Sequence, residues 1–495
     1  MRILTASVLV LALSGCPTTG AYTGPPINQL YYPTGIVHVD RPGNPHGLLF
    51  VANANFDKRF ATGSVVGFDL NRIPGIPPFG AFDPDGGAPQ LAALNIQAEA
   101  VVQVASFTGE MAGLETRDGG VRLYVPSRSE GNNFHAIDVA IGPDDQPALS
   151  CVLPPDAPAN ASLTDCPATA PSLTTFEFSE SGLPRAPAPF GVSVRARRCA
   201  GADDCGAGRS CDNGTCRAAN GDLFGDVWVT HITQADSPLA SGKDLQAFAV
   251  RLDSDSLALT ESNYVWLGPG ATSSVVQGQR WAYLSGRYNS STQSVNLMRL
   301  AEKRKVMDSS GNPVVVDAVV SAGLESTYRV GEARGVALSS DEKRLYLLGR
   351  APDSLIVVNI SDPTGDAPLL DVVRAVPLPE GSNQIRTIPR PGRSDLVAIT
   401  CTGQGVVVLY DDDVGDLVAQ VQGVGLQSFG LAVALRPPGA RLFVTNFSDG
   451  RVALIDIPDL NRPQEARIAG YLGAQQLCLT RGATTPGCMS NEVAQ

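Results

Sequence analysis

The chain has 495 residues, of which 43% are hydrophobic and 17% are charged, which is the balance of a folded protein with a buried core and not of a disordered chain. Its net charge of -12 at pH 7 would repel a phosphate backbone, which argues against nucleic acid as a partner. The 51 glycines and 37 prolines predict many tight turns, and the length suits one large repeat domain or two to three ordinary domains.

The N-terminus has the pattern of an export signal. Arg2 precedes an apolar run over residues 3–13 that is too short to span a bilayer, so residues 1–15 are predicted to be a cleaved signal peptide. The run ends in Leu13-Ser14-Gly15-Cys16, which resembles the bacterial lipobox, and this resemblance implies that Cys16 carries lipid and begins the mature chain. An ordinary secretory signal with a chance cysteine is the alternative. Position 17 is Pro and not the Asp that retains such lipoproteins at the inner membrane, which favours the outer membrane.

A cassette of three strand-like runs recurs along the rest of the chain. It is clearest at residues 427–457, where FGLAVAL, RLFVTN and RVALIDI are separated by turn residues, as in an antiparallel meander. The middle run of each cassette has an aromatic or apolar centre, and seven centres can be counted: Phe50, Tyr124, Trp228, Ala282, Tyr346, Val397 and Phe443. Because no unit of three to four strands can bury both its faces alone, the repeat predicts an all-β fold, a seven-bladed β-propeller over residues 31–473.

Two of the middle runs carry a known family motif. FVAN at residues 50–53 and FVTN at residues 443–446 resemble the YVTN-type repeat of the lactonase-like seven-bladed propellers. The resemblance covers most of Tyr31 to Gly473, is strong in the first and last units, and is degenerate in the fourth and sixth. The motif implies a fold and no particular chemistry.

The spacing between the units predicts what surrounds the propeller. A tether is expected over residues 16–30 and a tail over residues 474–495. Loop insertions are expected at 72–100 and 144–189, and a Cys-rich insertion at 195–222 should decorate the propeller without disturbing its core. An acid or an asparagine closes the third run in five units: Asp69, Asp138, Asn359, Asp411 and Asp456.

The ten cysteines fit an exported protein. Four of them lie in a segment with almost no apolar residues, which needs covalent staples, and they are predicted to form two disulfides: Cys199, Cys205, Cys211 and Cys216. Zinc is the alternative, but zinc sites usually have cysteines two to four residues apart. Cys151 with Cys166, and Cys478 with Cys488, are candidate local pairs, whereas Cys401 is expected to be a buried apolar residue and not a nucleophile.

Histidines and acidic clusters offer few metal or catalytic patterns. His38 lies on the first run of unit one, where it would either line the central channel or pack between blades. The clusters at Asp411–Asp413 and at Asp253 with Asp255 lack the spacing of a calcium loop and are interpreted as solvated turns. No metal or other cofactor is predicted, and no catalytic residue is assigned.

One set of residues is predicted to form a binding site. Inner strands of a propeller surround its axis, so polar residues at or just before them should gather near one mouth of the channel: Tyr32, Glu110, Arg334, Arg386 and Gln427. Two arginines and a glutamate there would make a polar pocket that accepts anions. The alternative is that each residue only pairs with a neighbouring blade.

Three functions remain open on the sequence alone. A membrane-anchored binding or scaffolding propeller is preferred, with the membrane and an unidentified envelope protein or small ligand as partners. The family resemblance also allows a lactonase-like hydrolase. A periplasmic accessory protein to a redox or metal enzyme is the third possibility.

Overall fold

The computed structural model describes residues 24–475 except 82–86, 129–133, 143, 154–156, 158, 167–187, 233–234, 237–244, 258, 260, 269, 288–297 and 323–331. Cys16, Cys478, Cys488, the signal peptide and most of the tail therefore lie outside the described residues. None of the helices in the described part of the chain has the length and apolarity needed to cross a bilayer. Within the described ranges, single-turn 3-10 helices accompany the strands: η1 (Leu70–Arg72), η2 (Ala98–Ala100), η4 (Ala202–Asp204), η5 (Glu261–Asn263) and η7 (Pro463–Glu465).

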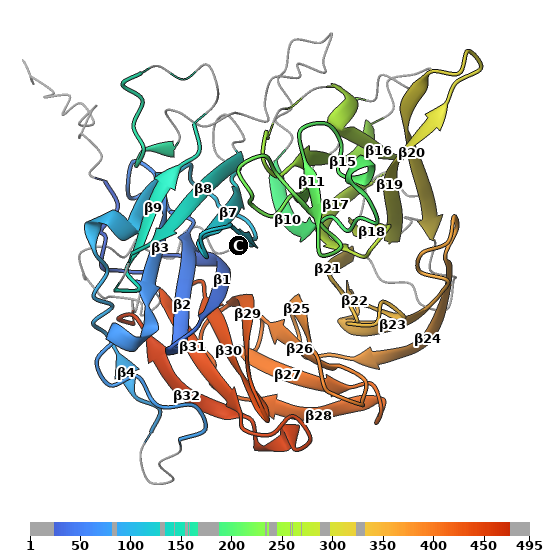
Figure 1. Cartoon of the computed structure of the whole chain (residues 1–495). Helices are drawn as coiled ribbons and strands as arrows, with labels where there is room; N and C mark the ends of the chain where they lie inside the picture. Colours follow the sequence, from blue (N-terminus) through green and yellow to red (C-terminus); the bar gives the residue numbers. More distant parts are fainter. Residues whose placement is uncertain are drawn as a thin grey trace, which may run out of the picture.

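Seven antiparallel sheets surround a central axis and form a seven-bladed propeller (Figure 1). The first four blades are β1 (Pro33–Arg41), β2 (Asn44–Asn53), β3 (Gly63–Asp69) and β5 (Val101–Val104); β6 (Ala112–Glu115), β7 (Val121–Pro126), β8 (Phe134–Ile141) and β9 (Pro147–Cys151); β10 (Pro189–Ala196), β13 (Gly225–His231), β15 (Leu245–Asp253) and β16 (Tyr264–Gly268), with β14 (Ala235–Asp236) also on β15; and β17 (Ala271–Gln277), β18 (Ala282–Arg287), β19 (Met298–Met307) and β20 (Pro313–Ala322).

The remaining blades are more compact. They are β21 (Glu332–Leu338), β22 (Arg344–Arg350), β23 (Ser354–Ser361) and β24 (Leu369–Pro377); β25 (Ser382–Ile388), β26 (Leu396–Cys401), β27 (Val406–Asp411) and β28 (Asp416–Val421); and β29 (Ser428–Arg436), β30 (Gly439–Asn446), β31 (Arg451–Ile457) and β32 (Arg467–Leu472). All seven predicted centres lie on the second strand of a blade, so the count of seven is confirmed. One boundary is wrong: the loop expected at 144–189 contains β9, the outer strand of blade two, whose alternating Pro147, Leu149 and Cys151 are buried.

The aromatic centres pack each blade against its neighbour. Phe443 of blade seven is buried and stacks on His38 of blade one, with ring centroids 5.0 Å apart. Tyr346 and Tyr410 make the corresponding contact between blades five and six, at 6.3 Å. Each buried aromatic side chain adds about 1.5–3 kcal/mol of hydrophobic stabilisation, so these two contacts strengthen the junctions between blades seven and one and between blades five and six.

Hydroxyl groups near the ends of second strands join neighbouring inner strands. Thr445, the third residue of the FVTN motif, accepts a hydrogen bond from the Gly430 N–H at 2.6 Å and donates to the Thr34 carbonyl at 3.0 Å, linking blade seven to blade one. Thr400 in the same way accepts from Gln384 and donates to Phe429, both at 3.1 Å. The hydroxyl groups of Thr445 and Thr400, at corresponding positions of the repeat, therefore form hydrogen bonds between blades.

The antiparallel order gives the ring two distinct faces. The links that enter each inner strand and the loops between second and third strands lie on one face, which we call the mouth face. The other loops lie on the far face. There the closing acids of the repeat meet basic or amide side chains: Arg441 Nε lies 2.6 Å from Asp456 Oδ1, and Asn44 Nδ2 donates to Asp69 Oδ1 at 2.8 Å.

The insertion at 72–100 fastens the first blade to the last. Its strand β4 (Gln90–Leu91) pairs in parallel with β32, the outer strand of blade seven. The Gly80 N–H donates to Asp456 Oδ2 at 2.8 Å, and Arg441 donates to the Pro77 carbonyl at 3.1 Å. This clasp closes the ring on its outside, while Thr445 closes it on its inside.

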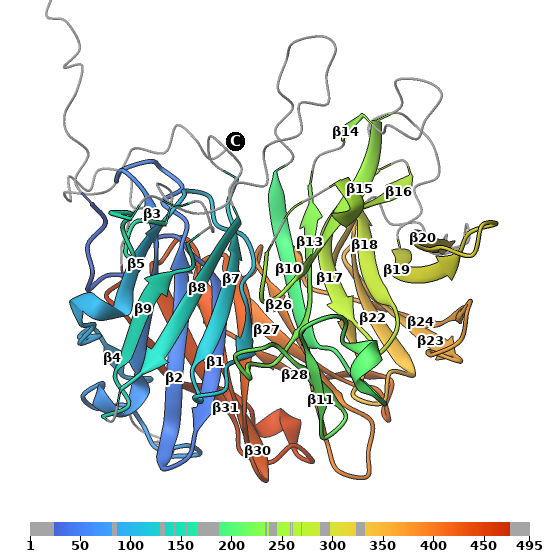
Figure 2. The same ribbon diagram turned by 45° about the horizontal axis from the view of Figure 1, so that its top comes forward.

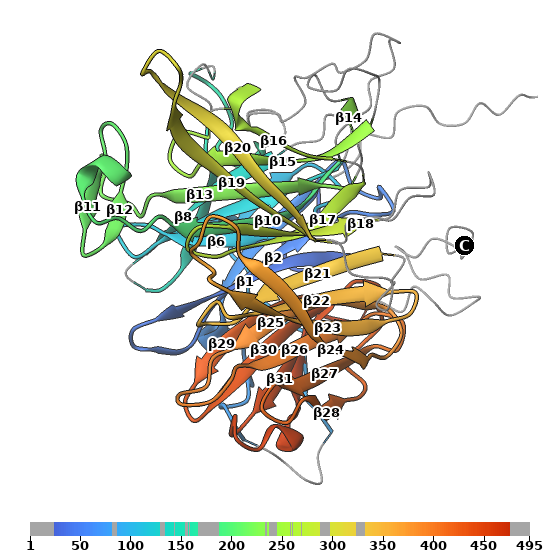
Figure 3. The same cartoon turned by 90° about the vertical axis from the view of Figure 1, so that its right-hand side faces the viewer.

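The Cys-rich insertion lies on the far face, between β10 and β13. It contains the small hairpin of β11 (Ser210–Asp212) and β12 (Thr215–Arg217), which Figures 2 and 3 show on the side of the ring opposite β14. Disulfides join Cys199 to Cys211 and Cys205 to Cys216, and a third joins Cys151 to Cys166. The predicted disulfides of these six cysteines are confirmed.

Candidate functional site

The central channel is a cavity of about 390 Å³ lined by all seven inner strands. Most of its lining is aliphatic, because inner strands rich in valine, isoleucine and leucine direct side chains toward the axis as well as between blades. Glu110 and Arg386 are the charged carboxylate and guanidinium groups among its lining residues.

Glu110 is bonded across the channel. It lies in the link before β6 in blade two, and its side chain is buried. Gln384 Nε2 on β25 of blade six donates to Glu110 Oε1 at 2.6 Å, so the bond joins two blades on different sides of the ring. Burial raises the pKa of Glu110, and the guanidinium of Arg386 acts in the opposite direction. Glu110 and Gln384 thus form a hydrogen-bonded pair that crosses the channel.

The other predicted binding residues take different places. Arg386 lines the same cavity as Glu110, and it donates to the neighbouring Ile385 carbonyl at 2.9 Å. Arg334 lies 2.6 Å from Glu332 on its own strand, and the cavity linings that contain Glu110 and Arg386 do not include it. Pairing within the blade, close to the alternative considered above, therefore describes Arg334 better than a role in an anion pocket.

Tyr32 and Gln427 lie at the rim, each in the link that enters an inner strand. Both have a positive φ, 48° and 55°, and their carbonyls accept hydrogen bonds from Ala54 and Phe447. Gly381 has the same place before β25, with φ 81° and a bond from Thr402. A left-handed residue costs a non-glycine side chain of order 1–3 kcal/mol, so the tight link positions Tyr32 and Gln427 at some expense in stability.

An apolar patch, which was not predicted, covers the rim beside these two residues. We call it the mouth patch, and its members come from blades one and seven and the links next to them: Tyr32, Phe56, Phe107, Leu426 and Phe447. Phe56 lies 5.4 Å from Phe447 and 5.5 Å from Phe107, centroid to centroid, and Tyr32 lies 5.0 Å from Phe447. Phe56 and Leu426 are 44% and 45% exposed, although large apolar groups gain by burial.

The mouth patch continues into the channel. Phe429 lines a separate small hollow that shares Glu110 and Arg386 with the channel cavity, and its ring centroid lies 6.3 Å from that of Phe447 and 6.1 Å from that of Phe190. A sequence signal for the patch existed: Phe56 and Phe447 lie within three residues of the asparagine that ends the second strand in the two units with the strongest motif.

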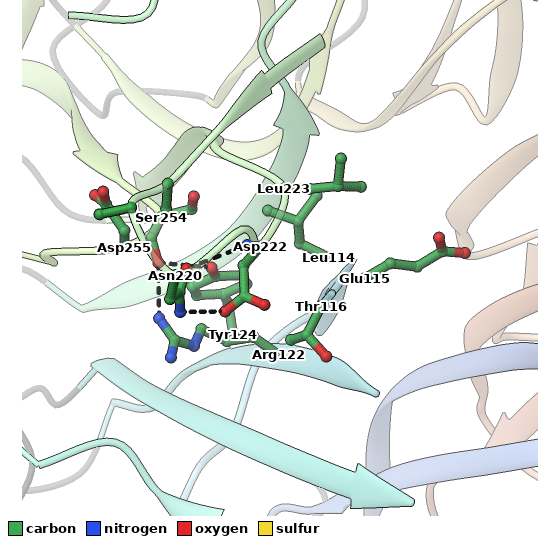
Figure 4. Close-up of a pocket in the computed structure, with 12 residues that line it drawn as sticks. Leu114, Glu115, Thr116, Arg122, Tyr124, Asn220, Asp222, Leu223, Ser254 and Asp255 are labelled. Atoms are coloured by element: carbon green, nitrogen blue, oxygen red, sulfur yellow. Dashed lines mark hydrogen bonds between the residues drawn. The ribbon is translucent and has the colours of Figure 1, made fainter. Parts of the chain in front are cut away.

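A second cavity, of about 250 Å³, lies between blade two and the Cys-rich insertion (Figure 4). Its prominent polar groups are already bonded. Arg122 holds both oxygens of Asp138, at 2.6 and 2.9 Å, and donates to the Ser254 carbonyl at 3.1 Å, while Asn220 donates to Asp222 at 2.6 Å. The cavity thus lies at the interface between the insertion and the propeller, and these polar groups are bonded within that interface.

The sulfur atoms of Cys199, Cys205 and Cys216 approach one another closely enough to suggest a metal site. In the structure each is half of a disulfide, and a disulfide sulfur is not the thiolate that zinc requires. Arg209 also fixes the insertion, since it lies 3.7 Å above the Phe224 ring and pairs with Asp253 and Asp255.

The acidic cluster of blade six is not a solvated turn. Arg390 binds Asp411 through both oxygens, at 2.6 and 2.8 Å, and Arg393 pairs with Asp413 at 2.9 Å, so these carboxylates serve the ion pairs of the far face. Asp255 lies in an exposed turn, as expected, and both Asp253 and Asp255 also pair with Arg209 of the insertion.

His38 and Cys401 have structural surroundings. His38 both borders the channel and stacks between blades one and seven, and its Nε2 lies 2.9 Å from the His46 carbonyl. Cys401 is a free, buried cysteine, and burial raises the pKa of its thiol to about 12, which leaves almost no nucleophilic thiolate at neutral pH.

Comparison with known proteins yields remote structural likenesses. No protein-family model matches the chain, and no curated protein matches it. Hydrazine synthase from Kuenenia stuttgartiensis aligns with 89% of this chain and 99% of its own at 12% identity and a TM-score of 0.45. Dihydro-heme d1 dehydrogenase NirN in complex with DHE aligns with 92% of this chain and 69% of its own, at 14% identity and 0.41. Apo AztD from Citrobacter koseri aligns with 88% of this chain and 90% of its own, at 11% identity and a TM-score of 0.37. These values assign no activity.

Proposed function

We propose that the protein is a lipoprotein of the outer membrane, anchored through Cys16, and that its propeller is a binding or scaffolding module. Its working surface is the mouth face, where Glu110, Arg386, Tyr32 and Gln427 border the channel. A ring of seven sheets is rigid, so a surface on its links is held in one shape and loses little entropy when it binds.

The mouth patch is the observation that carries this proposal. Two of its members, Phe56 and Leu426, stay exposed in the folded chain, and the half-buried rings of Phe107 and Phe447 support Phe56 from behind. Rigid aromatic side chains are the residues that supply most energy at binding surfaces. The polar groups beneath the patch are bonded to one another and so shape its floor.

Hydrolysis remains a second candidate because of one residue. Glu110 is a buried carboxyl group in a cavity, and its pKa is raised, as is common for a general acid. The short bond to Gln384 favours the structural role, since a catalytic group must be free to reach substrate.

Three measurements test the proposal together. Labelled palmitate should enter the wild-type chain and not Cys16→Ser, and the wild type should fractionate with the outer membrane. A photo-crosslinker at the exposed Gln427 should give discrete adducts, whereas one at the exposed Asn213 of the insertion gives none from the same surface.

Purified protein is expected to leave lactone substrates intact. Turnover that Glu110→Gln abolishes in a variant with an unchanged melting temperature would show a hydrolase. Copper or haem in the purified protein would instead favour the accessory role. Absence of palmitate from the wild type would contradict the anchor.

A further inference from the structure

The mouth patch and the N-terminal chain share one face of the propeller. Gly24, the first described residue, lies beside Gln103, which is next to last in β5, and the chain then crosses this face to Tyr32. Ile27 on the way is 43% exposed.

The length of the tether limits which face can meet a membrane. Gly24 lies eight positions after Cys16, and a fully extended chain over eight Cα-to-Cα steps spans about 28 Å. The far face is another strand length away, about 30 Å for the nine to ten residues of β1 and β2. A lipid at Cys16 therefore holds the mouth face close to the bilayer and leaves the far face pointing outward.

We propose that the mouth patch docks on the lipid bilayer, so that the propeller stands with its channel mouth on the membrane surface. This inference rests on the proposed anchor at Cys16. It names the bilayer as the occupant of the patch, and it assigns the outward position to the Cys-rich insertion.

The chemistry of the two faces supports this orientation. Phenylalanine, tyrosine and leucine are suited to the boundary between headgroups and acyl chains. Lys58 lies 5.5 Å above the Phe107 ring, which places a cation at the edge of the patch. The far face instead presents ion pairs, such as those of Arg209 and Arg393, that would lose hydration in a bilayer.

Net charge decides which lipids the patch prefers. At -12 the whole chain is repelled by an anionic surface, and a single lysine at the patch offsets little of that repulsion. Docking is therefore driven by apolar contact, and we expect it on zwitterionic lipid at least as strongly as on anionic lipid.

The test uses the mature chain with Cys16→Ser, exported so that its disulfides form, and phosphatidylcholine vesicles with or without phosphatidylglycerol. The protein should sediment with phosphatidylcholine vesicles. Phe56→Ser with Leu426→Ser should weaken the partition about tenfold, because both side chains are largely exposed and together lose much of the apolar area that docks. The matched control is Val315→Ser with Leu369→Ser, since these side chains are 52% and 68% exposed on outer strands of blades four and five.

Several results would overturn the inference. They are no sedimentation with either vesicle, an equal loss in the control pair, or a dimer in vesicle-free solution that the Phe56 and Leu426 changes dissociate, which would make the patch a contact between copies. Palmitate labelling of the wild type separates these failures from a failure of the anchor, because it reports on Cys16 whether or not the patch binds lipid.

Discussion

The two faces of the propeller use the same repeat for opposite purposes. On the far face, closing acids of third strands are neutralised by an arginine or an amide, as in Asp456 with Arg441, and the surface carries bonded charge. On the mouth face, the hydroxyl near the end of the second strand bonds between blades, as in Thr445, and the turn that follows leaves Phe447 half-buried beside the exposed Phe56. The closing acids of the repeat therefore give the far face a charged surface, and the turns after the second strands give the mouth face an apolar one. The difference between the two faces indicates function, whereas the propeller fold itself does not.

The largest expected effect concerns the charged face. Asp456→Ala leaves the guanidinium of Arg441 buried beside a lost partner, and it also removes the acceptor of the Gly80 N–H in the clasp. The free energy of unfolding should fall by about 3–5 kcal/mol in urea titrations. Asp459→Ala, which breaks an ion pair with the 60% exposed Arg462, should change the free energy of unfolding very little, because solvent screens exposed ion pairs. If both variants lost the same free energy of unfolding, the ion pair and the clasp at Asp456 would not stabilise the fold more than an exposed ion pair does.

The Cys-rich insertion should be an independently fastened part of that face. Replacing Cys199 and Cys211 by alanine should destabilise the insertion by about 2–4 kcal/mol, since the disulfide closes a separation of 12 residues. Limited proteolysis should then cut within 199–216 while the unfolding midpoint of the propeller is unchanged. Intact mass with and without reductant should show the disulfides, and stoichiometric zinc removed by a chelator would contradict them.

The mouth face should be sensitive to the hydroxyl bonds beneath it. Thr445→Val leaves the Gly430 N–H and the Thr34 carbonyl without their partner in a buried place, at a cost of about 1–3 kcal/mol. Thr445→Ser keeps the hydroxyl and should lose less. If the valine and serine variants unfold at the same urea concentration, the bond between blades contributes nothing and the assignment of the motif is wrong.

The smallest effect depends on pH at the channel floor. Because burial raises the pKa of Glu110, the native state holds its proton more tightly than the unfolded state. The resulting stability is complete below the ordinary glutamate pKa of about 4.3 and is lost as pH rises through the raised pKa. Glu110→Gln should therefore gain stability relative to wild type across that window, by at most about 1.4 kcal/mol per pH unit.

Urea titrations between pH 4.5 and pH 8 measure this difference. The exposed Glu115→Gln is the control and should follow the wild type at every pH. A stability difference for Glu110→Gln that does not change with pH would contradict a raised pKa at this buried carboxyl group.

Local pattern predicted most of the architecture, because strand periodicity and turn residues recur within 46 to 104 residues and each blade folds from its own segment. The prediction missed β9 because its five residues lie in a stretch rich in proline, alanine and aspartate. It also missed the clasp at β4, which needs contact between the first and last blades.

The candidate site was harder to predict from the sequence than the fold, for a physical reason. Glu110 and Gln384 are 274 residues apart, and only closure of the ring brings them together. The expectation that Arg334 shares a pocket with Glu110 did not consider Glu332, which lies on the same strand as Arg334 and pairs with it. The mouth patch combines single aromatic residues from turns of different blades, so no window of sequence contains it.

The orientation of the protein on a membrane, with the proposed lipid at Cys16, tests the central claim most directly. An environment-sensitive fluorophore would be attached at Phe56→Cys on the mouth face or at Val414→Cys, a 62% exposed position on the far face. The native Cys401 should not react, because it is buried and burial raises the pKa of its thiol. In vesicles that contain nitroxide-labelled lipid, we predict a blue shift and strong quenching for the label at position 56 and neither at position 414. Equal quenching at both positions, or quenching only at position 414, would contradict a propeller that stands with its channel mouth on the bilayer.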